Sequence, residues 1–427
     1  MRLPSLILAS AGNGHQVLYK SKAFESLNPK DFDAMCKRMD SISFDGNQSF
    51  FVTQSLGKMV IGRAKYITSD EYGDIKLKIT HCYFMNMHSF VDVVKAYRNQ
   101  NAAIGSFREH LRQDYGKEVE EVSFVRDSSA SQKLSNADIS DIIISLGMVD
   151  KTKKFMFAEV DSLDAIRVMF EYFPANFICD LSMLTEGETA TNDFNILFGN
   201  MNVLSDNKVI SIHTAAKGIS SLTAEVDEFV SSAYRKQIVE LMEHVSKLEN
   251  GYLAELVSVT RVVSKLESTG VLSASNIIKL MDKAASIEDK MSIFGILVDI
   301  KSSIEDSRIV DVEMIEKYWA FVLFKAIATG DKKNAALVHN VCTCLKGVDR
   351  ERYLGYVREA IAMRYTELDD ENLALLVLLA HEKKKEKTKL LNNRFDVRMA
   401  RSFIKNKISI STRLENVERI MVQMVLS

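Results

Sequence analysis

Two clusters of histidine and cysteine are the residues of this sequence best suited to chemistry. In the first, His81, Cys82 and His88 are of the types that form a thiol nucleophile with a general base. Adjacent residues of a strand point to opposite faces of its sheet, so we expect that His81 does not activate Cys82. The pattern therefore predicts a structural role for these side chains.

The second cluster has the types of zinc ligands. His339, Cys342 and Cys344 fall within one predicted helix, over residues 334–345. Only His339 and Cys342, three residues apart, share a face of that helix, whereas a structural zinc ion takes four converging ligands. We expect these side chains to be buried between helices, and the sequence predicts no metal site.

Two loops have some of the residues of binding loops. Glu186, Glu188 and Asp193 lack the alternating oxygen ligands of a calcium loop, and we expect them to be solvated. Gly12-Asn-Gly14-His15 follows an apolar strand, as a dinucleotide-binding loop does, but the third glycine is missing and strand-like residues follow. We interpret it as a hairpin turn, and no cofactor is predicted.

The C-terminal segment has a strong basic bias. Residues 381–427 contain twelve Lys and Arg and five Asp and Glu, a net charge of +7 in a chain whose net charge is −2. Three interpretations remain open: a solvated helical face, a surface for an acidic protein partner, and a nucleic-acid surface. Phe395 and Phe403 are its only aromatic residues, which argues against stacking on single strands. The candidate partner-binding residues here are Lys383, Lys384, Lys385, Lys387, Arg394, Arg398 and Arg401.

The positions of glycine and proline, which interrupt helices and strands, indicate how the chain is divided into domains. Glycine and proline together make up 21 of 427 residues, about 5% against an average near 12%. No proline follows Pro174, and six of the 18 glycines lie beyond Gly218. We therefore predict an α+β protein with a β-rich N-terminal domain (1–126), a small α/β middle domain (134–217) and an all-helical C-terminal half with long helices (218–427).

Alternating or continuous apolar runs predict the elements of the front half. In 75–84, for example, Ile75, Leu77 and Ile79 share one strand face with His81. The predicted strands are 3–9, 15–19, 49–53, 58–63, 75–84, 154–160, 176–181 and 208–213, and the predicted helices are 90–97 with Ser89 as N-cap, 102–111, 136–148 and 163–173.

The back half begins with apolar residues spaced alternately three and four apart, up to Leu266. This stripe is typical of a long helix that packs along a partner helix, within the molecule or in a homo-oligomer. A break at Asn250-Gly251 is the alternative. The candidate partner-binding residues of the stripe are Ile238, Leu241, Val245 and Leu248.

Helical spacing predicts eight further helices without a repeat of fixed period, so a helical solenoid remains open. They are 274–285, 287–301, 312–328, 334–345, 353–365, 372–386, 391–404 and 412–426.

The composition indicates an ordinary globular chain, with 47% hydrophobic and 26% charged residues. No apolar run approaches the roughly 20 residues that span a bilayer. The apolar run near the N-terminus is shorter than a signal peptide needs, and the five scattered cysteines are typical of reduced thiols. We expect a cytoplasmic protein without a membrane span.

Short motifs in the front half resemble the bacterial GTPase-associated protein 1 family. They are Gly12-Asn-Gly-His-Gln-Val-Leu, Val60-Ile-Gly-Arg-Ala-Lys-Tyr, the turn at 70–74 and Thr80-His81-Cys-Tyr-Phe, with Cys179 to Thr185 and Phe194 to Gly199 similar to the family's middle domain. The helical half has no such resemblance. The resemblance implies an adaptor, without enzymatic activity, that binds a GTPase or effector subunit in a bacterial defence or conflict system.

Two other function classes stay open beside this one. A hydrolase with dispersed residues would use His81 or His213 with loop carboxylates, and a nucleic-acid-binding protein would use the basic C-terminal segment.

Overall fold

A computed structural model of the chain describes residues 3–10, 14–42, 44, 48–68, 76–100, 134–148, 155–158, 168–179, 181–185, 194, 196–198, 209–211, 220–245, 251–329, 349–380, 416–417 and 419–420. The chain divides into two compact units. The sheet unit comprises Met1–Glu243 and Asn250–Thr260, and the helical unit comprises His244–Glu249 and Arg261–Ser427. This division falls between residues 243 and 261, not at residue 218.

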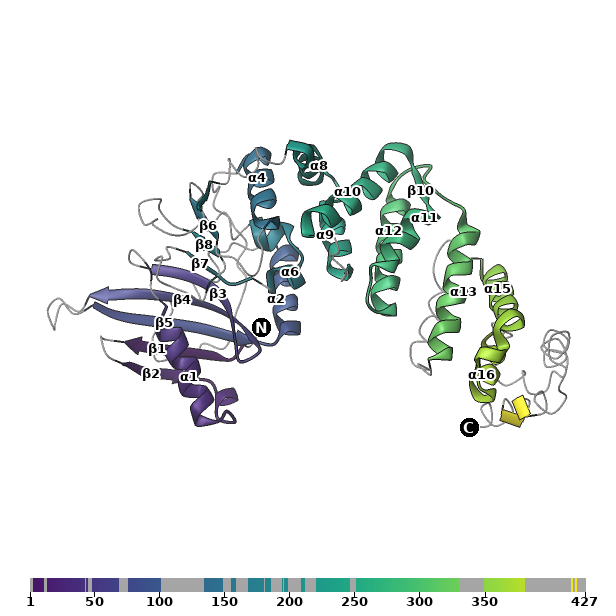
Figure 1. Ribbon diagram of the computed structural model, residues 1–427. Helices are drawn as coiled ribbons and strands as arrows, with labels where there is room; N and C mark the ends of the chain where they lie inside the picture. Colours follow the sequence, from purple (N-terminus) through teal and green to yellow (C-terminus); the bar gives the residue numbers. More distant parts are fainter. Residues whose placement is uncertain are drawn as a thin grey trace. The chain divides into compact units, whose positions relative to one another are not determined.

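One nine-stranded sheet forms the centre of the sheet unit (Figure 1). Its strands are β1 (Ser5–Ser10), β2 (His15–Lys20), β3 (Gln48–Ser55), β4 (Lys58–Thr68), β5 (Lys76–Met85), β6 (Phe155–Ala158), β7 (Met183–Thr185), β8 (Ile196–Phe198) and β9 (Val209–Ser211). In space they follow the order β2-β1-β5-β4-β3-β7-β8-β6-β9. The predicted α+β class is confirmed, with an antiparallel sheet at the N-terminus and a mostly helical remainder.

Strand pairing changes from antiparallel to parallel across the sheet. Strands β1 to β5 pair antiparallel, whereas β7, β8, β6 and β9 pair parallel. The two sets join because β3 pairs with β7, where Phe51 lies opposite Leu184. Strands from the predicted first and second domains therefore share a single sheet.

Most of the predicted strands are confirmed, including all of the first five. The hairpin between β3 and β4 turns through Leu56 and Gly57, which have φ angles of 51° and 69°. Positive φ at both central residues gives a turn whose twist matches that of the strands. Strands β7 and β8, of three residues each, were not predicted.

Helix α1 (Pro29–Asp40) covers one face of the sheet, and the sequence reasoning did not predict it. It begins because the side chain of Asn28 accepts a hydrogen bond from the Lys30 N–H and Pro29 occupies the first turn, where no donor is lost. Its Met35, Cys36 and Met39 pack with apolar side chains of six strands, and all are buried. The resulting core unites residues from both sets of strands.

The short segments around the sheet correct two predictions. Helix α2 (Met87–Gln100) starts before Ser89, because the side chain of Asn86 accepts the Ser89 N–H at 2.7 Å. The predicted strand 176–181 is wrong, since Ala175–Cys179 forms helix α6. Pro174 is the reason: its carbonyl accepts hydrogen bonds from the N–H groups of Phe177 and Ile178 and so starts a helical turn.

Helix α4 (Asn136–Gly147) agrees with its prediction and has a capping box of Ser135 and Asp138. Residues 168–172, within the predicted helix 163–173, are helical. The predicted helix 102–111 lies outside the described residues.

The predicted long helix is wrong. The stripe from residue 222 to 266 is divided among α8 (Ser220–Ser231), α9 (Arg235–His244) and α10 (Tyr252–Thr269). At the first break, the Ser232 hydroxyl accepts the Tyr234 N–H and its carbonyl accepts the Arg235 N–H. At the second, Gly251 has a φ of 87°, which supports the alternative of a break at Asn250-Gly251. Apolar spacing alone does not register these local breaks.

The helical unit contains α11 (Ala274–Asp282), α12 (Ile287–Ser303), α13 (Val312–Ala328), α15 (Arg350–Arg364) and α16 (Asp370–Ala380), with two short strands, β10 (Val271–Ser273) and β11 (Arg308–Val310). Two 3-10 turns complete the described elements, Lys22–Phe24 in the sheet unit and Tyr365–Glu367 in the helical unit. These helices confirm five predictions, although part of 372–386 is not described. The predicted helices 334–345 and 391–404, and most of 412–426, lie outside the described residues.

A repeat of fixed period organises these helices. The N-cap positions of α11, α13 and α15 are Ser273, Asp311 and Asp349, so successive helices begin 38 residues apart. The same spacing relates two sets of buried residues, Ile277, Ile315 and Tyr353 in one and Met281, Trp319 and Val357 in the other. The expectation that no fixed period exists is therefore wrong.

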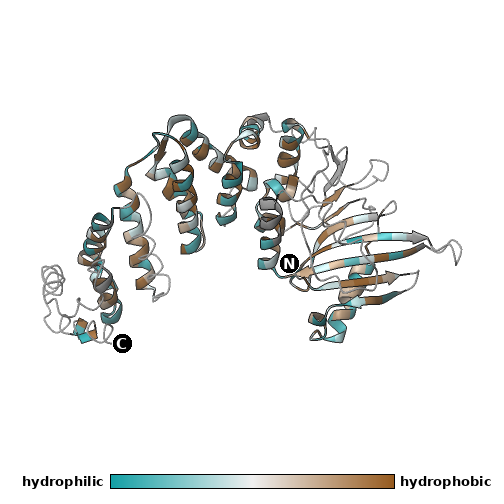
Figure 2. Ribbon diagram, turned by 180° about the vertical axis from the view of Figure 1, so that it is seen from behind, coloured by the Kyte–Doolittle hydropathy of each residue, from teal (hydrophilic) through white to brown (hydrophobic). Residues whose placement is uncertain are grey.

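Neighbouring helices of the repeat pack on one another in order. Helix α11 contacts α12 and α13, α13 contacts α15, and α15 contacts α16 (Figure 1). Figure 2 shows both hydrophobic and hydrophilic residues along these helices. Such a stack buries a continuous core although no single helix pair could do so. No helix in the described part of the chain is long and apolar enough to cross a membrane.

Candidate interaction surface

The structure keeps the first histidine and cysteine cluster apart. Cys82 is buried in the core under α1, where burial raises the pKa of its thiol. His81 faces the other side of β5, where it is 2% exposed and its ring centre lies 4.9 Å from that of Tyr83. His88 is exposed at the start of α2 and lies 3.7 Å from Asp92. These groups do not share a site.

The remaining candidates for chemistry lie outside the described residues. These are Glu186, Glu188, Asp193, His213, His339, Cys342 and Cys344. Among the described residues, no group of three or more His, Cys, Asp and Glu side chains could hold a metal ion.

The apolar stripe does not provide the predicted partner surface. Ile238, Leu241 and Val245 are each at most 1% exposed, so their side chains already belong to the interior. A stripe of this kind is indistinguishable in sequence from a surface that packs on another chain. Leu248 and the basic candidates Lys383, Lys384, Lys385, Lys387, Arg394, Arg398 and Arg401 lie outside the described residues.

A different surface, on α13 and α15, combines exposed apolar and charged side chains. Met314, Lys317, Phe321 and Lys325 are exposed and follow one another at spacings of three or four residues, so they share one face of α13. Residues of α15 lie beside them. We call this set the α13–α15 surface; its residues are Met314, Lys317, Phe321, Lys325, Tyr356, Met363 and Arg364.

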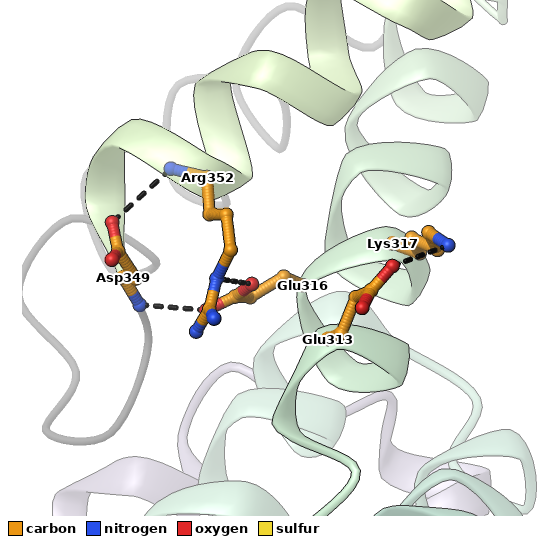
Figure 3. A network of polar contacts seen from close by, with 5 residues as sticks. All are labelled: Glu313, Glu316, Lys317, Asp349 and Arg352. Atoms are coloured by element: carbon orange, nitrogen blue, oxygen red, sulfur yellow. Dashed lines mark hydrogen bonds and ion pairs between the residues drawn. The ribbon is translucent and has the colours of Figure 1, made fainter.

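A buried ion pair fixes the two helices beside one another (Figure 3). The carboxylate of Glu316 is wholly buried and accepts hydrogen bonds from Arg352, at 2.8 Å from Nε and 3.1 Å from Nη2. It also accepts the backbone N–H of Asp349 at 2.8 Å, directly before α15 begins. A planar guanidinium held at two points leaves little freedom of rotation, so this contact sets the register between α13 and α15.

The register brings side chains of the two helices together on the exposed side. The ammonium of Lys317 lies 5.0 Å from the ring centre of Tyr356, and the guanidinium of Arg364 lies 5.3 Å from that of Phe324. Glu316, near the start of α13, contacts Arg352, near the start of α15. Phe324 and Arg364, which lie in contact, are both near the ends of their helices, so the two helices run in the same direction. The surface is therefore two parallel rows of side chains.

Phe321 is the centre of the surface. Its side chain is 38% exposed, whereas Trp319 and Phe324 on the same helix are almost completely buried. The ammonium of Lys325 lies 4.9 Å from its ring centre and the guanidinium of Arg364 lies 5.5 Å away. Both cations are attracted by the negative face of the ring, so the ring is held in place while part of it stays open to solvent.

Ion pairs neutralise some of the charges. Nζ of Lys317 lies 2.7 Å from Oε1 of Glu313 (Figure 3). The hydrogen bond from Lys317, with a smaller contribution from that of Tyr356, lowers the pKa of Glu313. The same hydrogen bond raises the pKa of Lys317. Arg364 lies 2.7 Å from Glu367. Lys325 has no ion pair with any residue that the structure describes.

Sequence reasoning missed this surface because its pattern is that of an ordinary solvated face. Glu313, Lys317, Phe321 and Lys325 recur every four residues, and only the phenylalanine among the charges is unusual. The sequence does not reveal that α15 supplies Arg364 to the same ring. Comparison of the sequence with protein-family models and with curated proteins found no match.

Proposed function

We propose that this protein is an adaptor without enzymatic activity, and that it binds a partner protein through the α13–α15 surface. One observation carries the proposal. Three large hydrophobic side chains are exposed in the described part of the helical unit, Met314 at 48%, Phe321 at 38% and Met363 at 67%, and all three lie on these two adjacent helices.

The chemistry of these side chains suits recognition. Exposed apolar side chains that gather in one place commonly mark a binding surface, whereas single ones need no explanation. An aromatic side chain is a typical anchor of such a surface, and methionine adapts its shape to different neighbours. Stacked helical repeats offer this surface on a rigid support.

The resemblance of the front half to the GTPase-associated protein 1 family supports a GTPase or an effector subunit as the partner, in a bacterial defence system. A non-enzymatic adaptor needs no constellation of catalytic side chains, and its affinity resides in surfaces such as this one.

Co-purification of the whole chain with the product of the neighbouring gene tests the proposal. We expect a stable complex at micromolar concentration, weakened at least about tenfold by the double variant Phe321→Asp and Met363→Asp. Leu18→Asp is the matched control, because Leu18 is 39% exposed on β2 of the sheet unit. Absence of a complex, or equal loss with the control, would count against the proposal; circular dichroism establishes that each variant is folded.

A further inference from the structure

We infer that the α13–α15 surface binds an acidic peptide segment of its partner, in which a large apolar side chain lies within one helical turn of a carboxylate. This inference rests on the proposed function and specifies the chemistry of what is bound. The apolar side chain packs on Phe321 and Met363, and the carboxylate pairs with Lys325.

The groups around Phe321 define the charge that the segment must bring. Both groups over the ring are cations, Lys325 from its own helix and Arg364 from α15. Glu367 already neutralises Arg364, at 2.7 Å. Lys325 has no ion pair with the residues that the structure describes, so the open charge beside the exposed ring is positive. A carboxylate next to an apolar side chain complements it.

The repeat extends this positive charge to the neighbouring helix. Lys279 of α11 precedes Lys317 by 38 residues, so the two occupy equivalent positions of parallel neighbouring repeats. It is exposed and forms no ion pair with the described residues. Lys279 therefore corresponds to the level of Lys317, about two helical turns before Lys325, and offers a second ammonium on α11.

The same surface suits nucleic acid poorly. Glu313 and Glu367 stand beside its cations, and Glu359 is close enough to Lys317 to affect the pKa of its ammonium. Such carboxylates repel a continuous phosphate backbone, whereas a peptide presents charges only at chosen positions. The exposed methionines contribute affinity only to an apolar side chain.

A peptide-phage library selected on the whole immobilised chain tests the inference. We expect the selected peptides to be rich in Asp and Glu with at least one large apolar residue. Their affinity, measured by fluorescence anisotropy with synthetic peptides, should fall about tenfold or more with Phe321→Ala and at least about threefold with Lys325→Glu. Lys325→Arg should retain binding.

Two matched variants control for general effects of charge and apolar area. Lys265→Glu changes an exposed lysine of α10, and Leu18→Ala removes a side chain as exposed as that of Phe321. Both should bind the selected peptides like the unaltered chain.

Four outcomes would overturn the inference. The first is basic or uncharged peptides, or none, and the second is acidic peptides that bind all variants equally. The third is a 20-nucleotide single strand bound at this surface and released by Lys325→Glu. The fourth is a dimer of the chain that dissociates with Phe321→Asp, which would make a second copy the occupant. If the complex with the neighbouring gene's product forms but ignores Lys325→Glu, this inference fails while the proposed function stands.

Discussion

The cores of the two units of this protein are built from different kinds of contact, long-range in the sequence in one and local in the other. In the sheet unit, pairing joins segments far apart in the sequence, as where Phe51 of β3 lies opposite Leu184 of β7. In the helical unit, each helix packs on helices of the same or the next 38-residue repeat. Long-range pairing demands that the whole sheet forms together, whereas repeats add stability in steps. A single substitution should therefore have a wide effect in the sheet unit and a local effect in the helical unit.

Natural probes distinguish the two units. The chain has one tryptophan, Trp319 in α13. Cys36, Cys82 and Cys179 are buried in the sheet unit, and burial, with the nearby carboxylate of Asp33, raises the pKa of Cys36 to about 11. Tryptophan fluorescence therefore reports on the helical unit, and thiol labelling in a background without Cys342 and Cys344 reports on the sheet unit.

The largest effect is expected for Trp319→Ala. The side chain is fully buried, as are the equivalent residues Met281 and Val357 of the neighbouring repeats, and its loss leaves a large cavity. We expect the helical unit to lose about 3–5 kcal/mol of stability, measured by circular dichroism in urea. The three cysteines of the sheet unit should stay protected. If those thiols became labelled at the same urea concentration at which helix is lost, the two units would unfold together, which would contradict this prediction.

Trp319→Phe is the control for this prediction. The indole N–H has no hydrogen-bond partner among the described residues, so phenylalanine removes ring volume without leaving a new unpaired group. Its cost should be well below that of alanine.

The repeat illustrates what sequence could and could not predict. The alternation of residues in β5 and the helical spacing of apolar residues in α11 and α15 predicted these elements correctly, because their physical causes are local. The period of 38 was missed because equivalent core positions share burial and not identity, as Ile315 and Tyr353 do. Packing selects volume and hydrophobicity, which many residue types supply.

The candidate surface was harder to predict than the fold. Phe321 is conspicuous in sequence only as one aromatic residue on a charged face, and Arg364 reaches its ring through the packing of another helix. The stripe from Ile238 to Val245 has a stronger pattern, yet it is buried. Periodicity indicates which residues are apolar together, but a tertiary structure is needed to decide which apolar residues remain exposed.

The second prediction concerns a glycine of the sheet unit. Gly62 of β4 lies opposite Phe51, and a Cβ added there would lie 2.2 Å from Cζ of the Phe51 ring. That ring is fully buried and cannot move aside without displacing its neighbours. We expect Gly62→Ala to destabilise the sheet unit by about 1–3 kcal/mol, seen as faster labelling of the three cysteines. Unchanged labelling would mean that the sheet is more adaptable than its packing indicates.

The third prediction tests the ion pair that sets the register of the repeat. Glu316→Gln keeps an acceptor for the Asp349 N–H but loses the charge, and should cost about 1–2 kcal/mol. Arg352→Leu should cost more, because it leaves a buried carboxylate with the Asp349 N–H as its remaining donor among the described residues, whereas Arg352 is half-exposed and can hydrate when Glu316 is absent.

The double variant Glu316→Gln with Arg352→Leu completes the cycle. It removes the buried charge together with its partner, so it should recover most of the loss caused by Arg352→Leu alone. Tryptophan fluorescence in urea measures all three. Additive losses would show that the two side chains act independently and that the pair does not hold α15 on α13.

The smallest expected effect has the opposite sign. Gly355 of α15 and Gly295 of α12 lie inside helices, where a Cβ added to either would meet no atom of the described residues within 4 Å. Alanine reduces the conformational freedom of the unfolded chain, so each substitution should raise the stability of the helical unit by about 0.5–1 kcal/mol. Gly147, the last residue of α4 in the sheet unit, is the matched control, because a Cβ there would lie 2.6 Å from the Leu253 side chain. Gly147→Ala should therefore destabilise the sheet unit. If all three substitutions shifted the urea midpoint in the same direction, close packing at the glycine would not explain the effect of the added Cβ.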